Sequence, residues 1–259
     1  MYYLIVMDID SIVQELALSE IKIVSVVGAG ISKASGMPTF RGEDGMWNQY
    51  RASDLATPYA FQKDPKLVWE WYRARMRLLL DAKPNPAHKA LTDLEREGLA
   101  IGIVTQNVDG LHEIAESKNI VEVHGRIRYA RCSVCNYIER WDSKDKSLKD
   151  ADLPYCPNCE KQIIRPDVVW FGEQIESKRW DKAIEWTLEA TIMLVIGTSG
   201  VVVPVSSLPI FAKKNNIKVI EFNIETTPIS SICDYSIFGP CEDTLPEFTQ
   251  KIIEISRRQ

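Results

Sequence analysis

Four short apolar segments rich in β-branched residues are spaced along the chain. Turn-forming residues bound them and they lack the alternation of a half-exposed strand, so each is typical of a strand buried on both faces of a parallel sheet. These segments are residues 21–27, 99–105, 191–196 and 217–222. Apolar positions with helical spacing lie between several of them, for example at 67–80 and 87–97. The alternation predicts right-handed βαβ units and an α/β fold with a doubly wound, mostly parallel, Rossmann-like sheet.

Two stretches do not follow this alternation. Residues 37–85 are rich in Trp, Tyr and Arg and are punctuated by prolines, and residues 126–165 contain four of the six cysteines around a polar middle. We expect both to be insertions that together form a smaller domain over the carboxyl edge of the sheet. The larger domain would then consist of residues 8–36, 86–125 and 166–259.

The composition is that of an ordinary soluble globular protein, with 45% apolar and 26% charged residues. A net charge of -5 disfavours broad contact with nucleic acid, whose binding surfaces are usually basic. The first residues show no basic segment or small-residue cleavage site of a secretion signal. Residues 190–212 carry no charge, but their glycines and prolines indicate a buried strand followed by a loop rather than a membrane span. We therefore expect a cytoplasmic protein without a membrane segment or specific nucleic-acid binding.

Two C-x-x-C pairs lie in the second insertion. They are Cys132 with Cys135 and Cys156 with Cys159. In a chain without a secretion signal this spacing favours metal over disulfides, with a redox pair or unrelated thiols as the alternative. Two facing turns with two thiolates each make a closed tetrahedral zinc site that has no open position, so we predict one structural Zn²⁺. Cys233 and Cys241 have no such partner and are expected in the core or in loops.

A glycine turn, Gly28-Ala29-Gly30, ends the first predicted strand. Such a turn lets backbone N–H groups approach a pyrophosphate at the start of a helix. Lys33 occupies the position of the third glycine in the G-x-G-x-x-G pattern, and no clear acidic residue closes a second strand about twenty residues later. The turn therefore predicts a dinucleotide site but weakens the alternative of a hydride-transferring dehydrogenase.

Polar residues also follow the second predicted strand, at Gln106, Asn107 and Asp109. The carboxyl ends of strands are where open α/β folds bind ligands. Asn107 and Asp109 would share a face if the strand extends that far. A simpler alternative is an Asx-type turn that caps the next helix.

The chain has three histidines, and histidine is the natural general base near neutral pH. His88 starts a predicted helix and is interpreted as structural. His112 and His124 both lie near strand ends, and spacing alone does not choose between them.

Taken together, these motifs resemble those of the sirtuin family. In order they are GAGIS (28–32), GMPTFRG (36–42), QNVDGLH (106–112), HG (124–125), the two cysteine pairs, RPDVVWFGE (165–173), GTS (197–199) and FNIE (222–225). The resemblance implies an NAD-dependent protein deacylase with acyl-lysine-containing proteins as its partners. It also implies that residues 37–85 are a cofactor loop with a helical module and that residues 126–165 are a zinc ribbon.

The resemblance implies a set of NAD-binding residues. They are Gly28, Ala29, Gly30, Phe40, Arg41, Gln106, Asn107, Asp109, Gly197, Thr198, Ser199, Asn223, Glu225 and Cys241. Phe40 and Arg41 would fold over the nicotinamide ribose, and Asp109 would hold the carboxamide. Asn223 and Glu225 would lie near the adenosine half.

The resemblance also implies His124 and Asn107 as the catalytic residues. His124 would deprotonate a ribose hydroxyl after the acyl oxygen has captured the ribose, and the products would be nicotinamide, lysine and O-acyl-ADP-ribose. The peptide would add a strand between residues 169–173, with Val169, Phe171, Gly172 and Glu173 as contacts, and residues 200–204.

Tyr72 and Arg75 are three residues apart and share a face of the predicted helix. Ordinary packing would bury the tyrosine ring and let the arginine extend to solvent. The sirtuin subgroup that acts on succinyl- and malonyl-lysine is similar in this Tyr-x-x-Arg pair and in an alanine that corresponds to Ala56. The resemblance therefore implies that Ala56, Tyr72 and Arg75 bind an acidic acyl group.

Two other functions remain open at this point. One is an NAD-dependent protein mono-ADP-ribosyltransferase, and the other is a zinc-ribbon module that binds nucleic acid. We expect the protein to be a monomer.

Overall fold

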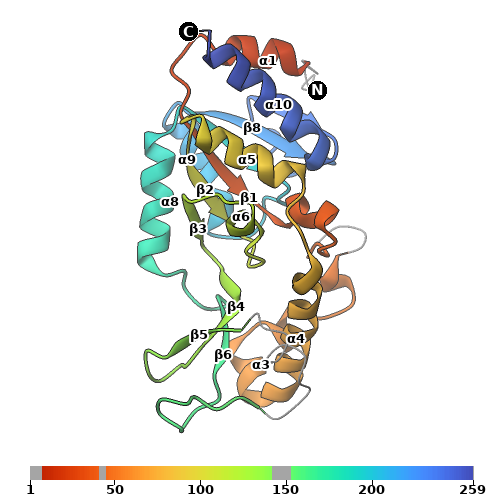
Figure 1. Cartoon of the computed structure of the whole chain (residues 1–259), viewed down its shortest axis with the longest axis vertical. Coiled ribbons are helices and arrows are strands. Elements are labelled where there is room, and N and C mark those ends of the chain that lie inside the picture. Colours follow the sequence, from red (N-terminus) through yellow and green to blue (C-terminus); the bar gives the residue numbers. More distant parts are fainter. Residues whose placement is uncertain (1–7, 41–44, 142–152, 259) are drawn as a thin grey trace.

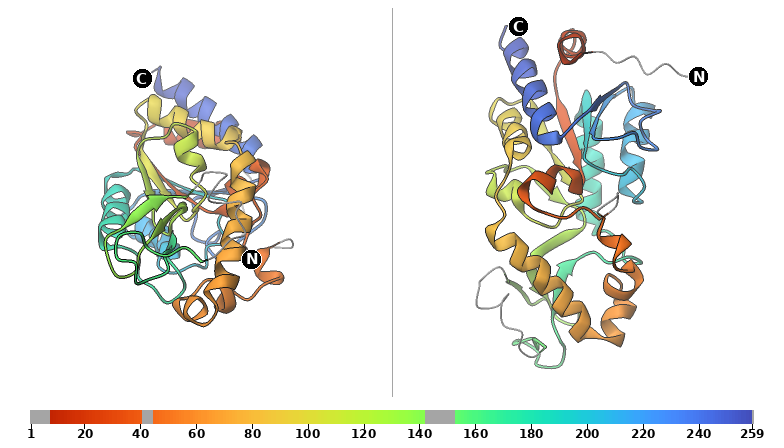
Figure 2. Two further views of the ribbon diagram at one scale, coloured as in Figure 1. Left: turned by 60° about the horizontal axis from the view of Figure 1, so that its bottom comes forward. Right: turned by 90° about the vertical axis from the view of Figure 1, so that its right-hand side faces the viewer.

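The computed structural model describes residues 8–40, 45–141 and 153–258, apart from the side chain of Trp47. The molecule is elongated, with a large α/β part at one end and a smaller part at the other (Figure 1). Figure 2 shows the same division from two more directions.

The large part is built on a six-stranded sheet in the order β3-β2-β1-β7-β8-β9, and every pairing in it is parallel. The strands are β1 (Ile23–Val27), β2 (Ala100–Thr105), β3 (Ile120–Glu122), β7 (Ile192–Ile196), β8 (Lys218–Asn223) and β9 (Tyr235–Phe238). The four segments with continuous apolar runs form the four central strands. The predicted fold class is confirmed.

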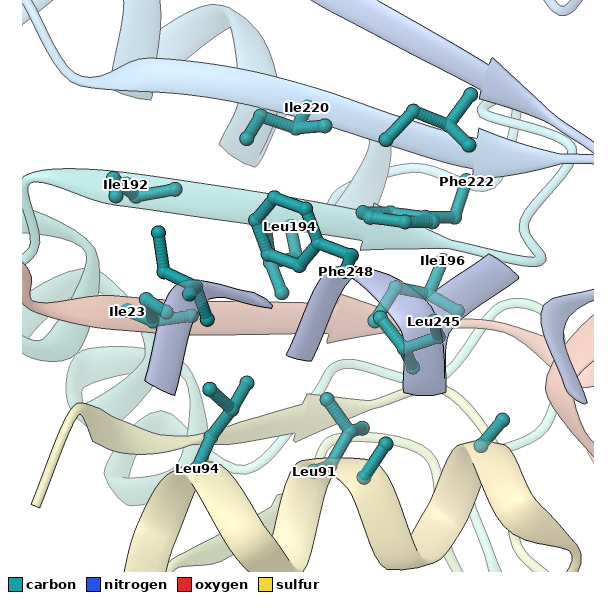
Figure 3. Packing of buried hydrophobic residues seen from close by; sticks show 14 of the residues in the cluster. Ile23, Leu91, Leu94, Ile192, Leu194, Ile196, Ile220, Phe222, Leu245 and Phe248 are labelled. Atoms are coloured by element: carbon teal, nitrogen blue, oxygen red, sulfur yellow. The ribbon is translucent and has the colours of Figure 1, made fainter. Parts of the chain in front are cut away.

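Helices cover both faces of this sheet. On one face lie α1 (Ile9–Leu16), α5 (Pro86–Arg96) and α10 (Cys241–Ser256), and on the other lie α8 (Ser177–Glu189) and α9 (Leu208–Lys214). In Figure 3, Leu91 and Leu94 of α5 and Leu245 and Phe248 of α10 point at the side chains of β1, β7 and β8. The ring of Phe248 meets that of Phe222 edge-on at 5.3 Å. A core on each face explains why β1 and β7 are apolar at nearly every position.

The smaller part combines the two insertions. The first insertion forms the helices α2 (Ala52–Leu55), α3 (Pro58–Lys63) and α4 (Pro65–Asp81). The second insertion contains most of a three-stranded antiparallel sheet in the order β5-β4-β6, made of β4 (Gly125–Arg131), β5 (Ile138–Arg140) and β6 (Arg165–Val168). Trp69 of α4 joins them, because its indole N–H donates to Ile164 O at 2.9 Å and its ring lies 4.7 Å from that of Trp141. The polar segment at 142–152 lies outside the described residues.

Local signals explain where several helices begin. Asp64 caps α4 by accepting the Leu67 N–H at 2.9 Å, and Pro65 fits the first turn, where its missing N–H costs nothing. Asn85 and His88 form a capping box at the start of α5. The remaining elements of the described residues are the short η1 (Ala29–Ser35), η2 (Met46–Asn48), α6 (Leu111–Ile114) and η3 (Val205–Ser207).

The prediction for residues 190–212 was half wrong. The strand is present as β7, but the expected loop after it turns into η3 and α9. Pro209 lies in the first turn of α9, where proline is compatible with a helix, so it does not mark a loop there. Among the described residues, no helix is long and apolar enough to cross a bilayer.

The first and last described helices pack against each other. The Lys251 ammonium of α10 pairs with Asp10 of α1 at 2.7 Å. Figure 1 places both helices at the end of the molecule opposite the small sheet.

Candidate active site

A cavity of about 620 Å³ lies at the carboxyl ends of β1, β2, β7 and β8, where the small part meets the large sheet. Its size is within the usual range for small-molecule sites. Every predicted cofactor and substrate residue lines it except Arg41 and Asp109. Arg41 lies outside the described residues, and Asp109 lines a small adjoining pocket together with Phe40, Arg75 and Asn107. The fold therefore gathers residues from seven of the motifs around one space.

Close packing of two glycine turns shapes the wall of the cavity. A Cβ atom at Gly28 would lie 2.7 Å from Gly197 O, and one at Gly30 would lie 2.7 Å from Gly197 Cα. The Gly30 N–H donates to Gly197 O at 2.8 Å, and Gly197 itself has a φ of +57°. Only glycine fits these positions, so the turns after β1 and β7 can close against each other at the strand ends.

Thr198 links three strand ends on this wall. Its hydroxyl accepts a hydrogen bond from Gln106 Nε2 at 3.0 Å, and its carbonyl accepts one from Asn223 Nδ2 at 2.9 Å. Gln106 follows β2, Thr198 follows β7 and Asn223 ends β8. The three polar side chains are thus held in place before any ligand arrives.

Asn107 and Asp109 meet at a residue that the sequence patterns did not single out. Ser32 Oγ donates a hydrogen bond to Asp109 Oδ2 at 2.8 Å and accepts one from Asn107 Nδ2 at 3.3 Å. The strand ends at Thr105, so the two side chains converge through a turn and not through a shared strand face. Asp109 Oδ1 accepts the Leu111 N–H at 2.9 Å, which makes the Asx-type alternative correct as well.

His88 lies behind Ser32 in a buried cluster. Its Nδ1 accepts the Asn85 N–H at 3.3 Å, so the proton of the neutral ring is on Nε2, which lies 3.4 Å from Ser32 Oγ. Burial lowers the pKa of His88 to about 4, and the ring is neutral at pH 7. His88 therefore supports the pocket around Asp109, as a structural residue would.

The structure separates the two histidines between which spacing could not choose. His112 is buried 5.0 Å from the His88 ring, and burial lowers its pKa well below the ordinary value. His124 lines the cavity, and its Nδ1 lies 3.2 Å from Gln106 O. Because that carbonyl can only accept, Nδ1 carries the proton and Nε2 is left as the basic nitrogen. Burial lowers the pKa of His124, and this effect is larger than that of the hydrogen bond to Gln106, which raises the pKa. The ring is therefore neutral near pH 7.

The four predicted metal ligands form one cluster in the small part. All four sulfur atoms lie within 4.8 Å of one another, with Cys132 to Cys159 at 3.8 Å and Cys135 to Cys156 at 3.6 Å. Sulfurs bound at about 2.3 Å to one tetrahedral zinc are separated by roughly 3.8 Å. The cluster fits a structural zinc ion, and none of its members lines the cavity.

Comparison with known proteins decides the family. Residues 28–204 match the model of the Sir2 family, which covers more than half of the chain. A Pyrococcus furiosus protein named NAD-dependent protein deacylase is 46% identical over 236 residues, covering 90% of this chain and 94% of that protein.

The chain belongs to the Sir2 family.

Solved structures agree with this assignment. The structure of a Sir2 homolog–NAD complex matches with a TM-score of 0.89 and 40% identity, covering 98% of this chain and 97% of that one. A Sir2 variant with a deacetylated p53 peptide and 3′-O-acetyl ADP ribose matches with a TM-score of 0.84 and 31% identity, covering 96% and 98%. The membership predicted from the motifs is confirmed, and with it the NAD-dependent class of enzyme.

In this Sir2-family chain, Tyr72 and Arg75 line the inner wall of the cavity. Tyr72 is 4% and Arg75 6% exposed, so the alternative in which ordinary packing lets the arginine extend to solvent is wrong. The Tyr72 hydroxyl accepts the Trp170 indole N–H at 2.9 Å, and burial raises the pKa of Tyr72 to about 12. The hydroxyl proton of Tyr72 therefore stays in place at neutral pH and is available to a ligand.

The Arg75 guanidinium lies between aromatic rings. Its centre is 4.7 Å from the Phe40 ring and 4.8 Å from the Trp71 ring, and Nη1 donates to Met46 Sδ at 2.7 Å. Within the described part of the chain no carboxylate pairs with it, and Nε has no partner. Burial lowers the pKa of Arg75, but a guanidinium keeps its charge at any physiological pH. A buried cation thus lines the cavity, and among the described residues Asp109 attracts it without forming a direct ion pair.

The segment after β6 forms another wall of the cavity. The Val169 N–H donates to His124 O at 2.8 Å, and the Phe171 N–H donates to Ala56 O at 2.9 Å. The Glu173 carboxylate accepts the Trp170 N–H at 2.9 Å and is paired with Arg165 at 2.9 Å. Glu173 therefore lines the cavity with a carboxylate that is already bound by the protein.

Cys241 starts α10 and is buried, so it occupies a core position and also lines the cavity as the family pattern implies. Burial raises the pKa of its thiol to about 12, which makes a reactive thiolate unfavourable. Cys233 is half-buried and its thiol donates to Ile229 O at 3.3 Å.

Proposed function

We propose that this Sir2-family protein removes acyl groups from protein lysines in an NAD-dependent reaction and prefers acyl groups that end in a carboxylate, such as succinyl and malonyl. The observation that carries the proposal is the shared cavity. It joins the glycine turns, a neutral His124 and the unpaired Arg75. The partners are proteins that carry acylated lysine.

The cofactor residues are assigned from their places on the wall. The turns at Gly28–Gly30 and Gly197–Ser199 would receive the diphosphate, because both line the cavity at the ends of β1 and β7, where backbone N–H groups can bind phosphate. Gln106 and Asn107 would hold a ribose, and Asp109 would hold the nicotinamide carboxamide in the adjoining pocket. NAD itself supplies the ribose carbon that takes the acyl oxygen as nicotinamide leaves.

His124 is the proposed general base. Its Nδ1–H is fixed on Gln106 O, which aims Nε2 away from this bond as the acceptor of a ribose hydroxyl proton. Asn107 would orient the same ribose, because its amide is held by Gly28 O at 3.1 Å and by Ser32. A backbone carbonyl positions His124, and a backbone carbonyl together with the Ser32 hydroxyl positions Asn107.

Arg75 and Tyr72 would bind the end of the acyl chain. A terminal carboxylate would give the buried guanidinium a direct ion pair, which no described carboxylate forms with it, and the Tyr72 hydroxyl could donate beside it. Hydrogen bonds to charged groups contribute about 1.5–3 kcal/mol each, which corresponds to roughly a tenfold to hundredfold preference. Ala56 contributes only a methyl group to this wall and leaves room for the chain.

The peptide backbone would lie between residues 169–173 and residues 200–204. The N–H groups of Val169, Trp170, Phe171 and Glu173 are all used within the protein. A bound peptide would therefore donate its own N–H groups to carbonyls on this side, which gives affinity with little sequence preference. In this proposal residues 8–36, 86–125 and 166–259 form the NAD-binding domain, 37–85 the cofactor loop and helical module, and 126–165 the zinc module.

The test is an NAD-dependent nicotinamide-release assay on matched acetyl- and succinyl-lysine peptides. We expect nicotinamide and O-acyl-ADP-ribose by mass spectrometry, with a higher kcat/KM for the succinyl peptide. In Arg75→Met the succinyl-to-acetyl ratio of kcat/KM should fall about tenfold to hundredfold, because the charged hydrogen bonds are lost.

Arg77→Met is the matched control. Arg77 lies on the same helix and carries the same charge, but it does not line the cavity. If both variants change the ratio equally, or neither does, Arg75 does not read the acyl carboxylate. An ADP-ribosylated protein in place of O-acyl-ADP-ribose would identify a mono-ADP-ribosyltransferase.

The pH dependence of kcat/KM follows from His124. Its pKa is lowered from the ordinary 6.5 by burial, and the base must be neutral to accept a proton. The rate should therefore stay constant as the pH falls through 6.5 and should decline only at lower pH. Profiles between pH 5 and 8 with an acetyl peptide, which has no acyl carboxylate of its own to titrate, measure this. A decline that begins well above pH 6.5 would contradict the assignment.

A further inference from the structure

A carboxylate lies at an unusual place in the main sheet. Glu221 is in the middle of the central strand β8, its side chain is 0% exposed, and its neighbours Ile220 and Phe222 belong to the core. Burial of a charged group costs several kcal/mol unless hydrogen bonds satisfy it. The position therefore needs an explanation beyond packing.

Three hydroxyl groups satisfy this carboxylate. Thr227 Oγ1 donates to Oε1 at 2.5 Å, Ser230 Oγ donates to Oε2, and Ser236 Oγ donates to Oε2 at 3.2 Å. Among the described residues no cation forms an ion pair with Glu221. The hydrogen bonds to this carboxylate thus all come from side-chain hydroxyl groups.

Two of the three hydroxyls come from the loop at 224–231, which follows β8. Ile224, Glu225 and Thr227 of this loop line the cavity on the side of Asn223. Ser230 Oγ also accepts the Thr227 N–H at 2.8 Å, so it bridges the loop to the carboxylate. Glu221, which does not line the cavity, consequently holds the loop in its path along the cavity through Thr227 and Ser230.

The same loop is packed at its far end against the turn after β7. Ile229 is buried, and a Cβ atom at Gly200 would lie 3.1 Å from its side chain. Gly200 follows the turn at Thr198 and Ser199 that lines the cavity. A shift of the loop would therefore move the wall on both sides of Asn223.

We propose that Glu221 is a positioning residue for the nucleotide part of NAD. Through Thr227 and Ser230 it holds residues 224–227 in the conformation that receives the ADP-ribose portion of the cofactor. This role rests on the proposed placement of NAD in the cavity. Glu221 touches no part of the cavity itself and acts only through the loop.

A purely structural role makes a different prediction, and the chain offers a matched pair to separate the two. Ser230 and Ser236 both donate to Oε2, and neither lines the cavity. Ser230 lies on the loop, whereas Ser236 lies on β9 within the sheet. Loss of either hydroxyl removes one hydrogen bond from the same carboxylate, but only loss of the first releases the loop.

The experiment measures the Kd of ADP-ribose by calorimetry, and Tm, for Ser230→Ala and Ser236→Ala. We expect Ser230→Ala to weaken ADP-ribose binding by about threefold to tenfold, because the hydrogen bonds that join the loop to Glu221 through Ser230 are lost, and Ser236→Ala to stay within about twofold of wild type. Both variants should lose Tm, and Ser230→Ala should lose more, because the Thr227 N–H also loses its acceptor in that variant. In turnover assays KM for NAD should rise in Ser230→Ala alone, with KM for the peptide unchanged.

Equal weakening by the two variants, or weakening by neither, would overturn the positioning role, because Glu221 would then serve only the sheet. Wild-type protein that binds no ADP-ribose would instead contradict the proposed cofactor site. These two failures are distinguishable in the same titration. Neither variant changes the charge or removes a large side chain, so both should fold.

Discussion

Replacement of His124 by alanine is expected to lower kcat by roughly 10²–10⁴-fold, the usual contribution of a general base. The imidazole is the one histidine side chain of the described chain that lines the cavity, and its Nε2 is the free acceptor there. Without the imidazole, only water would be left to accept the proton of the ribose hydroxyl. The measurement is single-turnover and steady-state deacylation of an acyl peptide.

The accompanying controls separate catalysis from folding. His124→Ala should keep its zinc content, its Tm within a few degrees and its Kd for ADP-ribose, because the side chain makes one hydrogen bond, to a backbone carbonyl. Near wild-type turnover in this variant would show that another group is the base.

Loss of the zinc site is expected to cost the small part of the molecule its fold, and with it the activity. In zinc-finger peptides structural zinc binding is worth about 10–16 kcal/mol, as much as the whole stability of a typical domain. The strand β4 begins directly after His124, and β6 leads into Val169, so disorder here reaches the cavity. We expect Cys156→Ser, or a strong chelator, to abolish bound zinc, lower Tm and remove most deacylation.

Cys233→Ser is the matched control for that variant. Cys233 lies outside the cluster, so the same chemical change should leave the zinc content at one ion per chain. Zinc-free Cys156→Ser with an unchanged Tm and full activity would refute a structural role for the metal.

The physical origin of each strand explains how much of the fold could be predicted. Strands β1 and β7 are covered on both faces, so nearly every residue in them is apolar and the pattern is plain, whereas β8 is also covered but contains Glu221. The edge strand β9 is only four residues long and half-exposed, and β4 alternates between polar and apolar positions. Such strands take their conformation from neighbours distant in the chain, which a local pattern does not record.

The site shows the same limit. The glycine turns and the cysteine pairs are local motifs whose chemistry follows from spacing. The roles of Ser32 and Glu221 depend on partners that only tertiary packing supplies, such as Asp109 for the first and Ser236 for the second. Burial of Arg75 likewise depends on rings from two segments, so the residue type alone favoured a solvent-exposed side chain.

The pairing of α1 with α10 has a practical consequence. These helices lie together at the end of the molecule opposite the small sheet. A tether attached after α10 would therefore hold the molecule on a sensor chip by this end. The small part, which meets the sheet at the cavity, would then lie on the side away from the support, so large acylated proteins could be assayed on immobilised enzyme.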